Sequence, residues 1–154
     1  MSIVVERTSR LAAPADEVWR HASSMAGVNA ELAPIVMTYP DHLARLPDQL
    51  PDDLPLGTPL FTSTLKLGPV PFDRHQLTLV EVDAGRSFQE DSTSWLNRRW
   101  RHRRTVTPLE GGCEVTDLLE VDPRLPVAGP LTRLLVERIF ARRHRVLAAR
   151  FGRR

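Results

Sequence analysis

Four ionisable residues fall at alternate positions of three consecutive strand-like segments between Phe88 and Val121. They are Glu90, His102, Arg104 and Asp117. Because successive side chains of a strand point to opposite faces, such residues lie on one side of a sheet together with their apolar neighbours. The apolar residues of that side are Phe88, Trp100, Val106, Val115, Leu119 and Val121. A face that mixes large apolar groups with charges is typical of the wall of a ligand cavity.

The turns between these segments decide whether the faces coincide. The segment 109–112 has the composition of a hairpin loop of four residues, which pairs even with odd positions and sets Asp117 opposite His102 or Arg104. The turn at 94–98 pairs even with even positions and sets Glu90 or Ser92 beside them. Extending the alignment back across 83–86 brings Leu77, Leu79 and His75 to the same face. A slip of one residue would move each set to the other side.

Two interpretations of the ionisable quartet stay open. In the first interpretation, the four residues form a structural network that fixes strand register, because buried charges must be paired. In the second interpretation, His102 and Arg104 also face the cavity and bind an oxygen-bearing or anionic group of a ligand. The two interpretations are compatible. General acid and base chemistry by His102, oriented by Asp117, is the enzymatic alternative.

Other chemistries find less support in the sequence. His75, His102, Glu90 and Asp117 have the residue types of a metal site but not its spacing, so we expect no metal and no cofactor. Neither a glycine-rich phosphate loop nor a nucleophile elbow occurs. The second half of the chain is rich in arginine, but acidic residues interleave with it and no nucleic-acid motif accompanies it. We therefore expect no nucleic-acid partner.

Three further residues of chemical interest are placed outside the site. His144 falls at the edge of an apolar helical sector, where packing or a surface salt bridge is expected. His21 has no partner at helical spacing. Cys113 is the only cysteine, which excludes a disulfide within the chain and predicts a small core residue.

The elements that must position these residues can be predicted along the chain. A helix starts at Ala13 to Glu17, with Val18, Trp19, Ala22 and Met25 on its apolar face, and Gly27 breaks it before a short helix at 29–32. A long final helix is expected over about 131–151. Strands are expected over 3–11, 35–39, 60–67, 72–82, 87–95, 98–108 and 113–122.

The final helix carries apolar residues over about half of its circumference. One flank can then pack on the sheet while the other closes a cavity with residues such as Ile139. Arg142, Arg143 and Arg150 lie within or beside the sector, where their aliphatic stems can pack while the guanidinium groups reach polar partners. The segment 40–59 is rich in Pro and Asp and fits no regular element, which indicates either an entrance loop or an insertion without a role.

Length and composition indicate one globular domain over residues 1–154. The chain has 42% apolar and 26% charged residues and a formal net charge of +2. We expect no signal peptide and no membrane span, and hence a cytoplasmic protein. The oligomeric state is left open, a homodimer included.

The order of elements, together with several segments, resembles the START-like superfamily, also called SRPBCC. These segments are 27–34, 88–92, 100–104, 112–117 and 140–145. The resemblance covers nearly the whole chain and points to a branch described only as ligand-binding. Birch-pollen-allergen-like proteins, aromatic polyketide cyclases and lipid-transfer domains belong to the same superfamily.

The resemblance implies an α+β helix-grip fold, in which a curved antiparallel sheet grips the C-terminal helix around a largely apolar cavity, with two short helices after the first strand. It implies binding of a small hydrophobic molecule, such as a lipid, polyketide or isoprenoid. The alternative is a cofactor-free cyclase or dehydratase that uses His102 and Asp117. The expected ligand-binding residues are Phe88, Glu90, Trp100, His102, Arg104, Asp117, His75 and Ile139.

Overall fold

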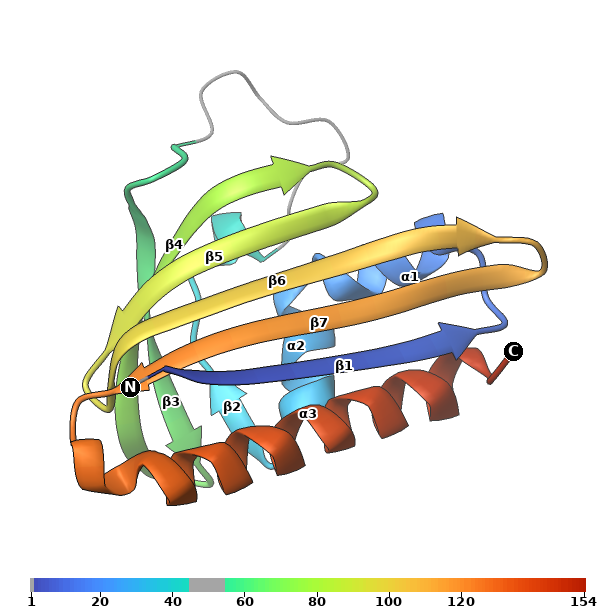
Figure 1. The fold of residues 1–154 in the computed structure, drawn as a ribbon. Coiled ribbons are helices and arrows are strands. Elements are labelled where there is room, and N and C mark those ends of the chain that lie inside the picture. The colour runs from blue at the N-terminus through green and yellow to red at the C-terminus, as the bar shows by residue number, and fades with distance from the viewer. Residues whose placement is uncertain (1, 45–54) are drawn as a thin grey trace.

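The computed structural model describes residues 2–44 and 55–154, which form an α+β helix-grip fold (Figure 1). One seven-stranded antiparallel sheet, in the order β1-β7-β6-β5-β4-β3-β2, curls along the long helix α3. Two short helices, α1 and α2, follow β1 and lie on the concave side of the sheet. The strands are β1 (Ile3–Leu11), β2 (Ile35–Met37), β3 (Pro59–Leu67), β4 (Val70–Asp83), β5 (Ser87–Ser94), β6 (Asn97–Leu109) and β7 (Gly112–Pro123). The helices are α1 (Ala15–Ala22), α2 (Met25–Leu32) and α3 (Gly129–Phe151), with 3-10 turns η1 (Asp41–Leu43) and η2 (Pro126–Ala128).

The central hairpins have the predicted parity. Arg104 pairs with Asp117 across β6 and β7, and Glu90 pairs with His102 across β5 and β6. The β6–β7 loop is shorter than expected, because the strands continue to Leu109 and Gly112 and leave a two-residue turn. Gly111 has a φ of 78° there, a conformation that suits glycine in tight hairpins. Two residues and four residues give the same parity, so the error in loop length does not change the face.

A bulge between Leu79 and Glu81 sets the phase of β4 against β5. Beyond it Leu79 pairs with Glu90 and His75 with Ser94, so that both β4 residues face the concave side, as expected from the sequence. The opposite face carries ion pairs between neighbouring strands, among them Arg99 Nη2 of β6 with Asp91 Oδ2 of β5 at 2.9 Å and Arg101 Nη1 of β6 with Glu120 Oε2 of β7 at 3.7 Å. The predicted solvated face is therefore confirmed.

The break between the first two helices lies at Ser23 and Ser24, not at Gly27 as predicted. The Ser24 hydroxyl accepts a hydrogen bond from the Gly27 amide at 3.0 Å and caps α2. Gly27 lies inside α2, where an added Cβ would stand 2.0 Å from the His21 carbonyl oxygen. The glycine is needed because the two helices approach each other closely at this point. The sequence prediction wrongly took it as the end of a helix.

Other boundaries shift by a few residues. β2 ends at Met37 instead of position 39, and α3 begins at Gly129 instead of position 131. Within the predicted entrance loop, Asp41–Leu43 form η1 and Pro59 begins β3. Residues 45–54, the centre of that predicted loop, lie outside the described residues.

The buried interior is layered along β6, β7 and α3. One apolar cluster contains Leu11, Ala15, Val18, Trp19, Val106, Cys113, Val115 and Leu147. A second cluster contains Ile3, Val5, Leu119, Val121, Val136 and Phe140. Between them lies a buried polar layer, because Asp117 separates Val115 from Leu119 on β7, and Arg143 and His144 separate Phe140 from Leu147 on α3. The buried ionisable residues of β7 and α3 thus lie at one level of the molecule.

Candidate functional site

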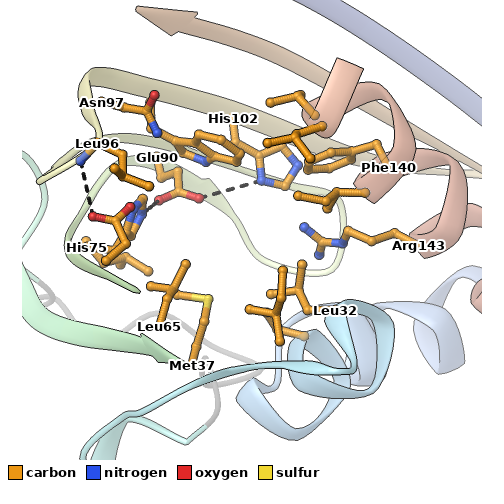
Figure 2. A pocket seen from close by; sticks show the side chains of 18 of the residues that line it. Leu32, Met37, Leu65, His75, Glu90, Leu96, Asn97, His102, Phe140 and Arg143 are labelled. Atoms are coloured by element: carbon orange, nitrogen blue, oxygen red, sulfur yellow. Dashed lines mark hydrogen bonds and ion pairs between the residues drawn. The ribbon is translucent and has the colours of Figure 1, made fainter. Parts of the chain in front are cut away.

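A cavity of about 450 Å³ lies between the concave face of the sheet, α2 and α3. Its volume falls in the range of small-molecule sites. Leu32 of α2, Met37 of β2 and Phe140 of α3 represent its mostly apolar wall (Figure 2). Trp95 and Leu125 line the cavity although they are 65% and 66% exposed, so the cavity opens to solvent at this end.

Six of the eight predicted ligand-binding residues line this cavity. They are His75, Phe88, Glu90, Trp100, His102 and Ile139. The other two, Arg104 and Asp117, are fully buried behind the wall and are absent from the lining. The structure therefore divides the predicted set into a wall that a ligand could reach and a layer that supports it.

Part of the polar wall is a row of three side chains from β4, β5 and β6. The ring Nε2 of His75 lies 3.0 Å from Glu90 Oε2, and His102 Nδ1 lies 3.6 Å from Glu90 Oε1. Ser92 adds a hydrogen bond from its hydroxyl to Glu90 Oε2 at 2.6 Å. Figure 2 shows this row facing the open space of the cavity.

Aromatic rings hold the two imidazoles from the side. The His75 ring meets the Trp100 ring edge-on with centroids 6.1 Å apart, and the His102 ring meets Phe140 at 5.2 Å and Phe88 at 5.6 Å. Such edge-to-face contacts restrict ring rotation. The row is consequently a rigid feature of an otherwise apolar wall.

The charge state of the row follows from its hydrogen bonds. Burial opposes ionisation of Glu90, but hydrogen bonds from His102 and His75 outweigh burial and hold the pKa of Glu90 well below its ordinary value. Burial likewise disfavours a charged His75, yet the hydrogen bond and charge of Glu90, with a smaller effect of Asp73, raise the His75 pKa above its ordinary value of 6.5. Both shifts favour an ionised Glu90 carboxylate paired with a protonated His75 ring.

Behind the row, Arg104 joins two buried carboxylates. Its guanidinium donates from Nε and Nη2 to Asp117 at 2.8 Å each, and from Nη1 and Nη2 to Glu31 at 3.0 and 2.8 Å. Burial opposes charge on all three groups, but their mutual attraction lowers the pKa values of Glu31 and Asp117 and raises the pKa of Arg104. The structural interpretation of these two predicted residues thus has direct geometric support.

Histidines extend this layer in two directions. Asp117 accepts hydrogen bonds from His102 Nε2 at 2.7 Å and from His144 Nε2 at 2.8 Å, and His144 Nδ1 lies 2.7 Å from the Ser9 hydroxyl. His21 Nε2 lies 3.1 Å from Glu31 Oε2. The predictions for His144 and His21 were therefore wrong, because long-range carboxylates supply the partners that helical spacing did not reveal.

Sequence reasoning also missed Glu31 as a member of the layer and did not select Arg143 as a site residue. Arg143 lines the cavity and donates from Nε to Glu31 Oε1 at 3.1 Å. The expectation that arginines in the apolar sector reach polar groups holds for Arg143. The sequence signal for Arg143 was its charge within the apolar sector of the final helix. Nothing in the local sequence identifies its partner Glu31, which lies 112 positions away.

The arrangement can bind and orient a ligand and can exchange a proton at His102. Among residues 2–44 and 55–154, no group of three or more His, Cys, Asp or Glu side chains is arranged to hold a metal ion. Within the same ranges, no helix has the length and apolar character needed to cross a membrane.

Solved structures of similar shape cover almost the entire chain. A protein from Chromobacterium violaceum has a TM-score of 0.69 at 16% identity, with 99% of this chain and 98% of that chain covered. The Zhui aromatase/cyclase of a Streptomyces species has a TM-score of 0.68 at 13% identity, with 97% and 93% covered. A START superfamily protein from Mycobacterium smegmatis has a TM-score of 0.65 at 14% identity, with 96% of both chains covered.

These likenesses show that the chain has the START-like, or SRPBCC, fold, as the resemblance implied. No curated protein matches the sequence significantly. One family model does match, and it spans residues 9–151 and is described as a domain of unknown function, DUF8410. The chain belongs to the DUF8410 family, whose fold in this member is START-like.

Proposed function

We propose that the protein binds a small hydrophobic molecule in the cavity between the sheet and α3. The observation that carries this proposal is a mostly apolar cavity of about 450 Å³ that opens to solvent and has a few fixed polar groups on its wall, the row of His75, Glu90 and His102 among them. An apolar wall supplies affinity through burial of hydrocarbon, and a few fixed polar groups supply orientation. Lipids, polyketides and isoprenoids have the required chemistry.

Displacement of a neutral fluorescent dye, Nile red, tests the proposal. Ile139→Trp places an indole in the cavity and should weaken dye binding by about tenfold or more, since it removes the space that the dye occupies. Val127→Trp is the matched control, because Val127 is 89% exposed and absent from the cavity wall. Unchanged dye binding by a folded Ile139→Trp variant would count against the cavity as the site.

A second candidate is a cofactor-free enzyme of the cyclase or dehydratase type. The observation in its favour is that His102 lines the cavity while its Nε2 is held by Asp117 at 2.7 Å, which leaves Nδ1 toward the cavity side, 3.6 Å from Glu90. A base oriented by a buried carboxylate suits proton transfer on a polyketide-like substrate. The likeness to the Zhui aromatase/cyclase supports the same reading by analogy.

The two candidates differ in what His102→Ala should do. An acid or base acts mainly on turnover, so kcat should fall far more than substrate affinity. Asp117→Asn should have the same effect if it still folds. Equal losses of affinity and turnover in both variants would favour simple binding.

A further inference from the structure

Arg143 differs from the other buried arginine, Arg104, in where its guanidinium points. Arg104 uses all three of its nitrogens on Glu31 and Asp117. The Arg143 side chain is only 6% exposed, yet it lines the cavity and its guanidinium reaches into the open space between His102 and Leu32 (Figure 2). It is the cavity-lining guanidinium of the polar layer.

Two contacts fix the orientation of this group. Its Nε donates to Glu31 Oε1 at 3.1 Å, and its central carbon lies 4.8 Å from the centre of the Phe140 ring. Glu31 is itself held by Arg104, so the acceptor cannot follow a moving Arg143. The guanidinium is therefore pre-organised before any ligand binds.

The two terminal nitrogens of Arg143 make no hydrogen bond to any residue that the structure describes. Glu31 does not accept hydrogen bonds from these two nitrogens, because its oxygens already accept from Arg104 and His21. Neither nitrogen belongs to the buried side-chain atoms that lack a partner, so both are open to the space of the cavity that Arg143 lines. The donors are left for something that enters the cavity.

The geometry of these donors selects the entering group. Two adjacent nitrogens in one plane match the two oxygens of a carboxylate, which a guanidinium binds with parallel hydrogen bonds. Two carboxylates without an arginine partner, Glu90 and Asp73, also line the cavity and would repel a carboxylate placed at the polar row. Within the polar layer, an acidic ligand therefore finds a fixed cationic partner at Arg143.

We propose that Arg143 anchors the carboxylate of a hydrophobic carboxylic acid whose hydrocarbon part fills the cavity. This inference rests on the proposed function, since it names the class of molecule that the cavity binds. It assigns a role to a residue of α3 that was outside the predicted ligand-binding set.

The test compares dodecanoic acid, dodecanol and methyl dodecanoate as competitors of Nile red, each below its aggregation concentration. The wild-type protein should bind the acid about tenfold or more tightly than the alcohol or the ester, because a hydrogen bond to a charged group contributes roughly 1.5–3 kcal/mol. Arg143→Gln should abolish this preference and leave affinity for the alcohol within about twofold. Arg143→Lys, which keeps the charge but loses the planar pair of donors, should retain only part of it.

Arg138→Gln provides the matched control, because Arg138 is an exposed residue of the same helix and the substitution removes the same charge. It should keep the full preference for the acid. Circular dichroism melts establish that each variant is folded, and Arg143→Lys serves as the test if Arg143→Gln is not.

The outcomes separate this inference from the proposal on which it rests. A wild-type protein that binds alcohol and acid equally, or a folded Arg143 variant that still prefers the acid, overturns the carboxylate anchor and leaves hydrophobic binding intact. Failure of all three competitors and of the dye itself to bind the wild-type protein would overturn both.

Discussion

At the scale of single residues, the stability of the polar layer depends on pH in two opposite ways. Glu31, Glu90 and Asp117 have folded-state pKa values below their ordinary values of 4.5, 4.5 and 3.8. Stability from a depressed pKa is present above the ordinary value and is lost as the pH falls. His75 has a raised pKa, so its contribution is complete below 6.5 and is lost as the pH rises through the folded value.

The directions of these pKa shifts predict a maximum of the unfolding free energy between about pH 4.5 and pH 6.5. In this range the stabilising contributions of the carboxylates and of His75 are both present. Urea denaturation over a pH series measures it. His75→Gln should flatten the decline on the alkaline side. His42→Gln, at an exposed histidine, should leave that decline in place. If His75→Gln retains the full alkaline decline, the His75–Glu90 pair is not its origin.

Arg104 has the largest predicted effect of a single side chain on stability. Arg104→Leu leaves the buried carboxylates of Glu31 and Asp117 without their shared counter-ion, and breaking a buried pair in this way costs about 3–5 kcal/mol. Arg103→Leu is the neighbouring control, because Arg103 is on the other face of β6 and its ion pair is largely exposed. The control should cost no more than about 1 kcal/mol.

Chemical denaturation of both variants measures the difference. Equal losses for Arg103→Leu and Arg104→Leu would show that the buried layer does not depend on its arginine. The comparison uses two adjacent positions of one strand, so strand propensity is matched.

The residue types of the polar wall could be predicted from the sequence, but their partners could not. Alternation within β5, β6 and β7, together with the parity of the two turns, placed Glu90, His102, Arg104 and Asp117 on one face, since strand and hairpin geometry are local. The contacts of Glu31 with Arg104 and Arg143 join positions 73 and 112 residues apart. No sequence periodicity spans such separations, so the contacts of Glu31 with the two arginines could be identified only from the folded structure.

At the scale of elements, the junction of α1 and α2 tolerates no side chain at Gly27. An added methyl group would overlap the His21 carbonyl, which belongs to the backbone and cannot rotate away. Gly27→Ala should therefore destabilise the protein by about 1–3 kcal/mol, even though alanine is the better helix former. Ala30→Ser, at an exposed site of the same helix, should cost less than about 0.5 kcal/mol.

Thermal denaturation of the two variants checks this prediction. A Gly27→Ala protein as stable as the wild type would mean that the helix junction relaxes without cost. The expected loss also reaches the site, because Glu31 belongs to the same helix and would shift with it.

The order of elements was predictable, whereas their junctions were less so. Strand parity survived a wrong loop length in the β6–β7 hairpin because two-residue and four-residue loops give the same pairing. The bulge near Leu79 was invisible in the sequence, since its effect is a change of register and not of composition. Gly27 was misread because a glycine that permits close packing looks the same as one that ends a helix.

At the scale of the whole molecule, a layer of charged groups lies between the two apolar clusters. The cavity meets the polar layer at His102 and Arg143 and the second apolar cluster at Val136 and Phe140. A ligand in this cavity would contact both environments at once. An amphiphilic molecule therefore suits the cavity better than a pure hydrocarbon.

α3 contributes to every one of these layers, with Val136 and Phe140, then Arg143 and His144, then Leu147. The ribosome makes all seven strands before it makes this helix. Until α3 emerges, α1 and α2 alone cover the concave face, and Asp117 lacks His144. The nascent sheet is thus a surface on which chaperones can act, and the protein completes its interior only after translation of its final helix.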